Sequence, residues 1–159
     1  MTFLRILVGL DRSELGQAVF TQALVLAQSC GAHLHVLHVF DLEPMAVSGL
    51  SPLTPSAPEL GIYSTLVHST PWSQHNQAHV DQIHAWLQQQ CQVALNQGVP
   101  AEFSYRVGSP GGVLCEVAQH WQADLVVVGH RGRSGLVEAL LGSISNHVVH
   151  HSPCSVLVV

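Results

Sequence analysis

Residues 123–132 read Ala-Asp-Leu-Val-Val-Val-Gly-His-Arg-Gly, a short apolar run that ends in glycines. The run Leu125–Val128 has no polar face, which is typical of a central parallel strand covered by helices on both sides. The glycine-rich segment continues to Gly142, and a helix is expected from Ser143 to about His150. We therefore expect an α/β fold in which a glycine-rich loop follows a central strand.

Strands and helices alternate along the rest of the chain. Further strands are expected at Phe3–Gly9, His33–Phe40, Ala101–Val107 and Ser155–Val159. Further helices are expected at Asp11–Cys30, at His75–Gln97 and from Pro110 onward, with Ser109 as the cap of the last of these. This alternation predicts parallel pairing with right-handed crossovers. We expect one domain over residues 1–159, with a long proline-rich loop at about 41–73.

The strand at 101–107 alternates polar and apolar residues, so it belongs at an edge of the sheet. The strand order 3-2-1-4-5 satisfies this requirement. It gives a single doubly wound, five-stranded parallel sheet of the Rossmann-like class, with helices on both faces. The first and fourth strands then meet at the topological switch point. A ligand should bind beyond their carboxyl ends, at Gly9–Asp11 and Gly129–Gly132.

The composition excludes several functional classes. Of 159 residues 47% are hydrophobic and 9% charged, which argues against a disordered chain. All five basic residues are arginine, so P-loop NTPases, protein kinases and pyridoxal-phosphate enzymes, which need a lysine, are excluded. With a net charge of −5 and no basic patch, nucleic-acid binding is not expected. No apolar run is long enough for a membrane helix, and we expect a cytoplasmic protein.

The glycine-rich segment suggests a phosphate site. Gly129, Gly132 and Gly142 let backbone N–H groups approach phosphate oxygens, and the helix at Ser143 adds free donors. The hydroxyls of Ser143 and Ser145 could donate to the same anion, and Arg131 and Arg133 could supply charge. The alternative is an ordinary loop with turn glycines.

Asp11 also has two interpretations. With Glu14 three residues later it could form a capping box, and at the tip of the first strand it could accept hydrogen bonds from a ribose. Val39 and Val128 end two other strands and could form apolar walls for an adenine. As sheet residues they would be apolar in any case.

Five stretches together carry a family resemblance: Ile6–Asp11, Val107–Pro110, Ala123–Gly129, the motif Gly129-x2-Gly132-x9-Gly142-Ser143, and His151–Val159. The arrangement resembles the universal stress protein family, in the branch that binds ATP. The resemblance spans nearly the whole chain apart from the 41–73 loop. One departure is that the family's loop often has histidine or serine where this chain has Arg131 and Arg133.

The resemblance implies a bound adenine nucleotide, ATP, with Mg²⁺ or Mn²⁺ held by its phosphates. The implied site consists of Leu10, Asp11, Val39, Val128, Gly129, Arg131, Gly132, Gly142, Ser143, Ile144 and Ser145. Within it the base lies near the two valines, the ribose near the aspartate, and the phosphates along the glycines and serines. The resemblance also implies a homodimer made by antiparallel pairing of the 155–159 strands. This agrees with the composition of that strand, which is apolar and has no charge or proline to protect an exposed sheet edge.

Fast catalysis is not indicated, and no catalytic residue is assigned. There is no lysine, and the carboxylate nearest in sequence to the glycine loop is Glu138. The first hypothesis is an ATP-binding regulatory dimer of the stress response. The alternatives are a slow ATPase and a nucleotide-free interaction protein.

The histidines and cysteines do not define a metal site. His147 and His151 share a helix face, but no third or fourth ligand can be identified. The sequence does not decide which face of the sheet His33, His35 and His38 occupy. The four cysteines are scattered, which favours reduced thiols over disulfides.

Overall fold

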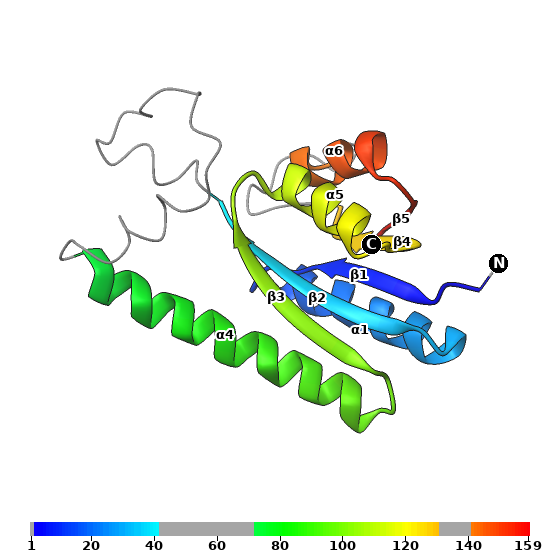
Figure 1. Ribbon diagram of the computed structural model, residues 1–159, viewed down its shortest axis with the longest axis horizontal. Coiled ribbons are helices and arrows are strands. Elements are labelled where there is room, and N and C mark those ends of the chain that lie inside the picture. The colour runs from blue at the N-terminus through cyan, green and yellow to red at the C-terminus, as the bar shows by residue number, and fades with distance from the viewer. Residues whose placement is uncertain (1, 42–71, 131–140) are drawn as a thin grey trace.

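The computed structural model describes residues 2–41, 72–130 and 141–159. The strands are β1 (Arg5–Gly9), β2 (His33–Phe40), β3 (Ala101–Val107), β4 (Leu125–Val128) and β5 (Ser155–Val158). The helices are α1 (Glu14–Cys30), α4 (Trp72–Asn96), α5 (Pro110–His120) and α6 (Ser143–His151). All strand pairs are parallel, and the order is β3-β2-β1-β4-β5 (Figure 1). The predicted fold class and strand order are confirmed.

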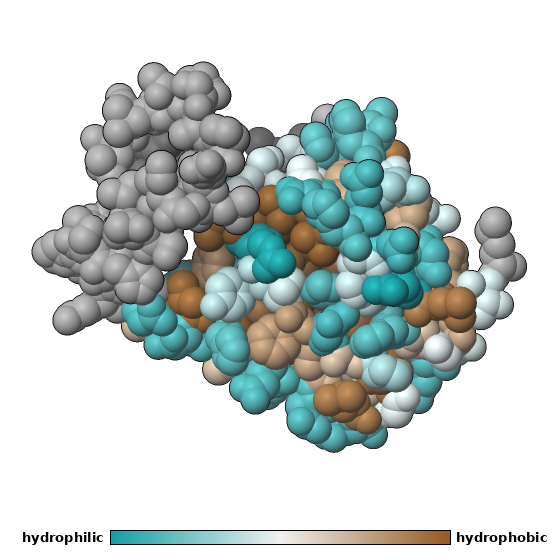
Figure 2. Space-filling model, in the orientation of Figure 1, coloured by the Kyte–Doolittle hydropathy of each residue, from teal (hydrophilic) through white to brown (hydrophobic). Residues whose placement is uncertain are grey.

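Helices cover both faces of the sheet (Figure 1). Helices α1 and α4 bury one core cluster with residues such as Phe20 and Leu87, and α5 and α6 bury a second with Leu114 and Val148. Because β1 and β4 are covered on both faces, their central residues are fully buried. Hydrophilic residues cover much of the outer face of α4 (Figure 2), although Val93 and Leu95 near its end are exposed.

Several element ends differ from the expected ones. Strand β1 begins at Arg5 rather than Phe3, and the backbone N–H groups of Leu4 and Arg5 both donate to the Asp124 carboxylate. Helix α4 begins at Trp72, inside the segment expected to be loop. The rest of that expected loop, residues 42–71, lies outside the described residues.

The register places the ends of β1 and β4 side by side. Val8 pairs with Val127, so Gly9 and Val128 stand at the same level of the sheet. Just beyond them, the Leu10 N–H donates to the Leu37 carbonyl oxygen over 2.9 Å, which ties the exit of β1 to β2. The segments that begin at Asp11 and Gly129 therefore leave the sheet from one edge, as the predicted switch point requires.

Candidate functional site

A hydrogen bond closes the loop that follows β4. The N–H of Gly142 donates to the carbonyl oxygen of His130 over 2.6 Å, and His130 is held in turn by its own N–H to the Val159 carbonyl oxygen, over 2.8 Å. The end of β4 and the start of α6 are therefore brought together at the switch point. Arg131 and Gly132, two predicted site residues, lie outside the described residues.

Helix α6 begins with backbone donors rather than a capping side chain. Its N-cap is Gly142, which has no side chain, and the first helical bond runs from the Asn146 N–H to the Gly142 carbonyl oxygen. The N–H groups of Ser143, Ile144 and Ser145 precede that bond, and the described residues offer them no capping oxygen. The helix dipole adds partial positive charge there, so the arrangement can accept an anion.

Ser145 differs from the expectation that its hydroxyl faces a ligand. The residue is 1% exposed, and its Oγ donates toward the carbonyl oxygens of Gly142, at 3.0 Å, and His130, at 3.3 Å. The hydroxyl therefore holds the closed loop ends together.

Asp11 is not the helix cap. The N-cap of α1 is Ser13, whose Oγ accepts the N–H of Gly16 over 3.0 Å, so the capping-box interpretation of Asp11 and Glu14 is wrong. Asp11 supports the cap instead, since its Oδ1 accepts both the N–H and the hydroxyl of Ser13. Among the described residues no hydrogen bond uses Oδ2, which leaves one carboxylate oxygen for a ligand.

The remaining predicted residues lie at the same edge of the sheet. Val39 and Val128 both belong to the cluster beneath α5 and α6, Val39 half-buried and Val128 fully buried. Leu10 is buried on the opposite side of the sheet, in the cluster beneath α1 and α4. Gly129 packs closely against α1, because a β-carbon built on it would lie 3.1 Å from Cδ2 of Leu15.

A cavity of about 210 Å³ lies beside Asp11, between the start of α1 and the middle of α4. Its lining is Leu10, Asp11, Arg12, Ser13, Gly16, Gln17, Trp86 and Gln90. The last two residues come from α4 and were not predicted as site residues. A signal existed in the sequence, because Gln90 is a polar residue within the apolar stripe of that helix, at 8% exposure.

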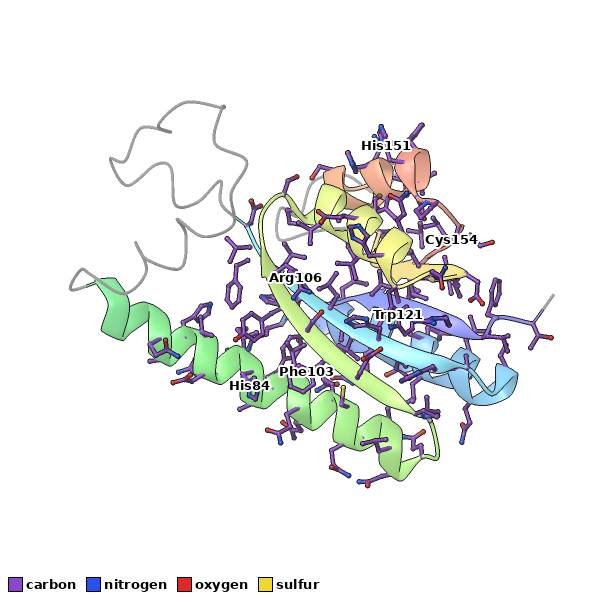
Figure 3. All side chains as sticks on the ribbon, in the orientation of Figure 1. His84, Phe103, Arg106, Trp121, His151 and Cys154 are labelled. Carbon is purple, nitrogen blue, oxygen red and sulfur yellow. The ribbon has the colours of Figure 1, made fainter. Side chains whose placement is uncertain are left out.

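The two buried histidines of β2, His35 and His38, lie on opposite faces of the strand. His38 packs beneath α4, where its ring Nδ1 donates to the Leu10 carbonyl oxygen over 2.8 Å. His35 lies on the α5 face, with its ring 5.1 Å from Trp121, a side chain that Figure 3 shows against the sheet. Burial lowers the pKa of His35, and the nearby Glu102 carboxylate opposes that effect.

The described residues hold no group of three or more histidine, cysteine, aspartate or glutamate side chains arranged to bind a metal ion. His147 and His151 do share a face of α6, with their rings stacked at 4.2 Å. Parallel rings direct their in-plane lone pairs side by side rather than toward one ion. In the described part of the chain, no helix is both long and apolar enough to cross a membrane.

Comparisons with known proteins place this chain in a family. The model of the universal stress protein family matches residues 2–159. A universal stress protein of Synechocystis sp. is 36% identical over all of this chain and 99% of its own length. The universal stress protein YxiE of Bacillus subtilis is 31% identical over 99% of both chains.

Solved structures agree with these matches. The universal stress protein UspA from Lactobacillus plantarum has a TM-score of 0.74 at 26% identity, over 100% of this chain and 99% of that one. A universal stress protein in complex with cAMP has a TM-score of 0.65 at 24% identity, over 100% and 98%. The fold, the glycine-rich segment and the match over residues 2–159 together show that this chain belongs to the universal stress protein family.

Proposed function

We propose that this chain binds ATP at the carboxyl edge of the sheet, between β1 and β4. The observation that carries the proposal is the junction of His130 with Gly142, which brings the uncapped start of α6 to the end of β4, next to the strand that Asp11 follows. Solved relatives of similar fold add support: one is in complex with cAMP, and one from Archaeoglobus fulgidus is in complex with dAMP.

The proposed pose follows the geometry of the edge. The phosphates lie against the N–H groups of Ser143 and Ile144, with Gly129, Arg131 and Gly132 as further contacts and Mg²⁺ or Mn²⁺ held by the phosphate oxygens. A ribose hydroxyl donates a hydrogen bond to Oδ2 of Asp11. The base lies over the ends of β2 and β4, near Val39 and Val128.

The proposed role is that of a dimeric, nucleotide-binding regulator of the stress response in the cytoplasm. Strand β5 is an edge strand without charged residues, flanked on one side only by β4. Such an edge exposes unpaired N–H and C=O groups, and a second copy of β5 in antiparallel pairing would cover them.

The test begins with freshly purified protein, which is denatured so that mass spectrometry can identify any released nucleotide. Calorimetric titration of stripped protein with ATP and Mg²⁺ or Mn²⁺ follows, for the wild type and for Gly142→Val. Gly142 has φ −60° and ψ 159°, which valine adopts readily, so its side chain should exclude phosphate without straining the backbone. We expect at least a tenfold loss of affinity, roughly 1.4 kcal/mol.

Gly112→Val is the matched control, because a β-carbon there meets open space and the residue is not in the proposed site. Co-purified ATP, with affinity lost only in Gly142→Val, supports the proposal. ADP alone would favour a slow ATPase. Wild-type protein that binds no adenine nucleotide would overturn the nucleotide-binding function and leave an interaction protein.

A further inference from the structure

Two buried side-chain atoms of the described residues have no hydrogen-bond partner, Nε of Arg5 and Nδ1 of His35. Both residues lie against the indole of Trp121, the C-cap residue of α5 (Figure 3). The Arg5 guanidinium stands 4.5 Å from the centre of the indole, and this cation–π contact compensates its buried nitrogen. Nδ1 of His35 has no such compensation, although buried polar atoms are normally hydrogen-bonded.

The contacts of the His35 ring define its neutral form. Its Nε2 lies 2.8 Å from Oγ of Ser104, and its Nδ1 lies 4.0 Å from Oε1 of Glu102, which is too far for a hydrogen bond. A lone pair on Nδ1, facing a negative carboxylate, accounts for that separation. The ring proton then sits on Nε2 and is donated to Ser104.

The Glu102 carboxylate already has a different partner. Its Oε1, the oxygen that faces His35, accepts the indole N–H of Trp121. Glu102 and His35 are direct partners in the β2–β3 register, so the backbone keeps their side chains adjacent. The Glu102 side chain is 48% exposed and has room to turn. Its bond to Trp121 fastens the C-terminal end of α5 to the edge strand β3.

The charges around the ring set the pH range in which His35 gains a second proton. Burial lowers the pKa of His35 most, and the Glu102 carboxylate opposes that effect. The positive groups of Arg106 on β3, His33 on β2 and Arg5 on β1 lower this pKa further. The side chain that α5 places against the ring is an uncharged indole. Protonation is therefore expected only on the acid side of pH 6.5.

We propose that His35, Glu102 and Trp121 form a pH-sensitive switch. A proton from solvent binds Nδ1 of His35, the Glu102 carboxylate turns to accept the new Nδ1–H, and the indole N–H of Trp121 loses its acceptor. The imidazolium is the stronger donor of the two because it carries a charge of its own. In neutral solution Glu102 ties α5 to β3. In mild acid it ties β2 to β3, and the end of α5 is released.

The experiment is an NMR titration of the full chain between pH 7.5 and pH 5. It follows the indole N–H proton of Trp121, assigned by its loss in Trp121→Phe, and the ring C–H protons of His35. A hydrogen-bonded N–H proton resonates downfield of a free one. We expect the Trp121 signal to move upfield, toward its position in Glu102→Ala. It should move at the pH where His35 is half-protonated, below pH 6.5.

Three variants separate the switch from a simple response of Trp121 to nearby charge. In Glu102→Ala the indole signal should stay upfield, and the pH of half-protonation of His35 should fall by about one unit. In His35→Gln the signal should stay downfield at every pH. His33→Gln is the matched control, because the His33 ring also stands edge-on to Trp121, at 5.9 Å. This control should keep the wild-type transition.

Several results would overturn the proposal. If the Trp121 signal of the wild type stays downfield while His35 takes up its proton, Glu102 keeps the indole and the switch is wrong. The same holds if the transition survives in His35→Gln or is lost in His33→Gln. If His35 is still neutral at pH 5, or the protein unfolds first, no switch operates. If His35→Gln does not fold, Glu102→Ala decides, since an unchanged half-protonation of His35 would exclude the ion pair.

Discussion

Gly16 packs directly against Asp11: a β-carbon built on Gly16 would lie 2.2 Å from the Asp11 carbonyl oxygen and 2.7 Å from its Oδ1. Only a residue without a side chain lets the first turn of α1 come this close to the exit of β1. That approach holds the Asp11 carboxylate against Ser13 and thereby positions its second oxygen at the proposed ribose site.

Gly16→Ala should destabilise the protein, because the clash is with backbone atoms that cannot rotate away. We expect a loss of about 1–3 kcal/mol in the free energy of unfolding, measured by urea denaturation. Gly112→Ala, where the new methyl group meets open space, should instead be neutral or stabilise by up to about 1 kcal/mol. Equal effects of the two substitutions would show that the Asp11 contact is unimportant.

The pH dependence of stability should contain a contribution from His35. Burial lowers the folded-state pKa of His35 below the unfolded value of 6.5, against the opposing effect of Glu102. Below pH 6.5 the His35 imidazole is therefore protonated in the unfolded chain while it is still largely neutral in the folded protein. The contribution to stability is complete above pH 6.5 and is lost as the pH falls toward the folded pKa, by at most about 1.4 kcal/mol per pH unit.

Urea denaturation between pH 7.5 and pH 5 measures this effect. His35→Gln should flatten the acid side of the curve relative to the wild type, whereas His33→Gln, at an exposed position on the same strand, should not. An unchanged acid slope in His35→Gln would rule out His35 as the source.

Cys91 should be inert toward thiol reagents in the folded protein. Burial, reinforced by the nearby Glu102, raises the pKa of the Cys91 thiol to about 11. At pH 8 only about one thiol in a thousand is then the reactive thiolate. Mass spectrometry after timed alkylation should find Cys91 modified far more slowly in buffer than in 8 M urea. Comparable rates in the two solutions would contradict the burial of this thiol.

The outer edge of β5 can be tested as a dimer interface without disturbing β4. The Val159 N–H donates inward, to the Val128 carbonyl oxygen, so the alternation of a strand points the Val156 N–H outward. Val156→Pro removes an outward donor, and proline is tolerated at such edge positions. Analytical ultracentrifugation should show a dimer for the wild type and a monomer for Val156→Pro. A folded variant that remains dimeric would place the interface elsewhere.

Much of the fold could be predicted because the apolar pattern of this chain is nearly unambiguous. Strands β2, β3 and β4 match the predicted ranges to the residue, and the polar alternation of 101–107 correctly put β3 at an edge. Parallel strands with helical connections have few possible orders, so the edge assignment determined the switch point. The N-cap residue of α1 was harder to predict, because Asp11 and Ser13 are both of types that favour the N-cap. Only the path of the chain out of β1 selects Ser13.

The sequence by itself determined which residues form the central strands, and that Asp11 and Gly129 follow two strands that are neighbours in the sheet. It could do so because hydrophobic periodicity and the rules of parallel pairing can be applied to the chain without knowledge of its packing. The tertiary structure alone decided that His35 and His38 lie on opposite faces of β2, since a strand buried on both faces carries no polarity to distinguish them. It alone brought Trp86 and Gln90 to the cavity beside Asp11, because helices about 70 residues apart meet only through packing on the common sheet.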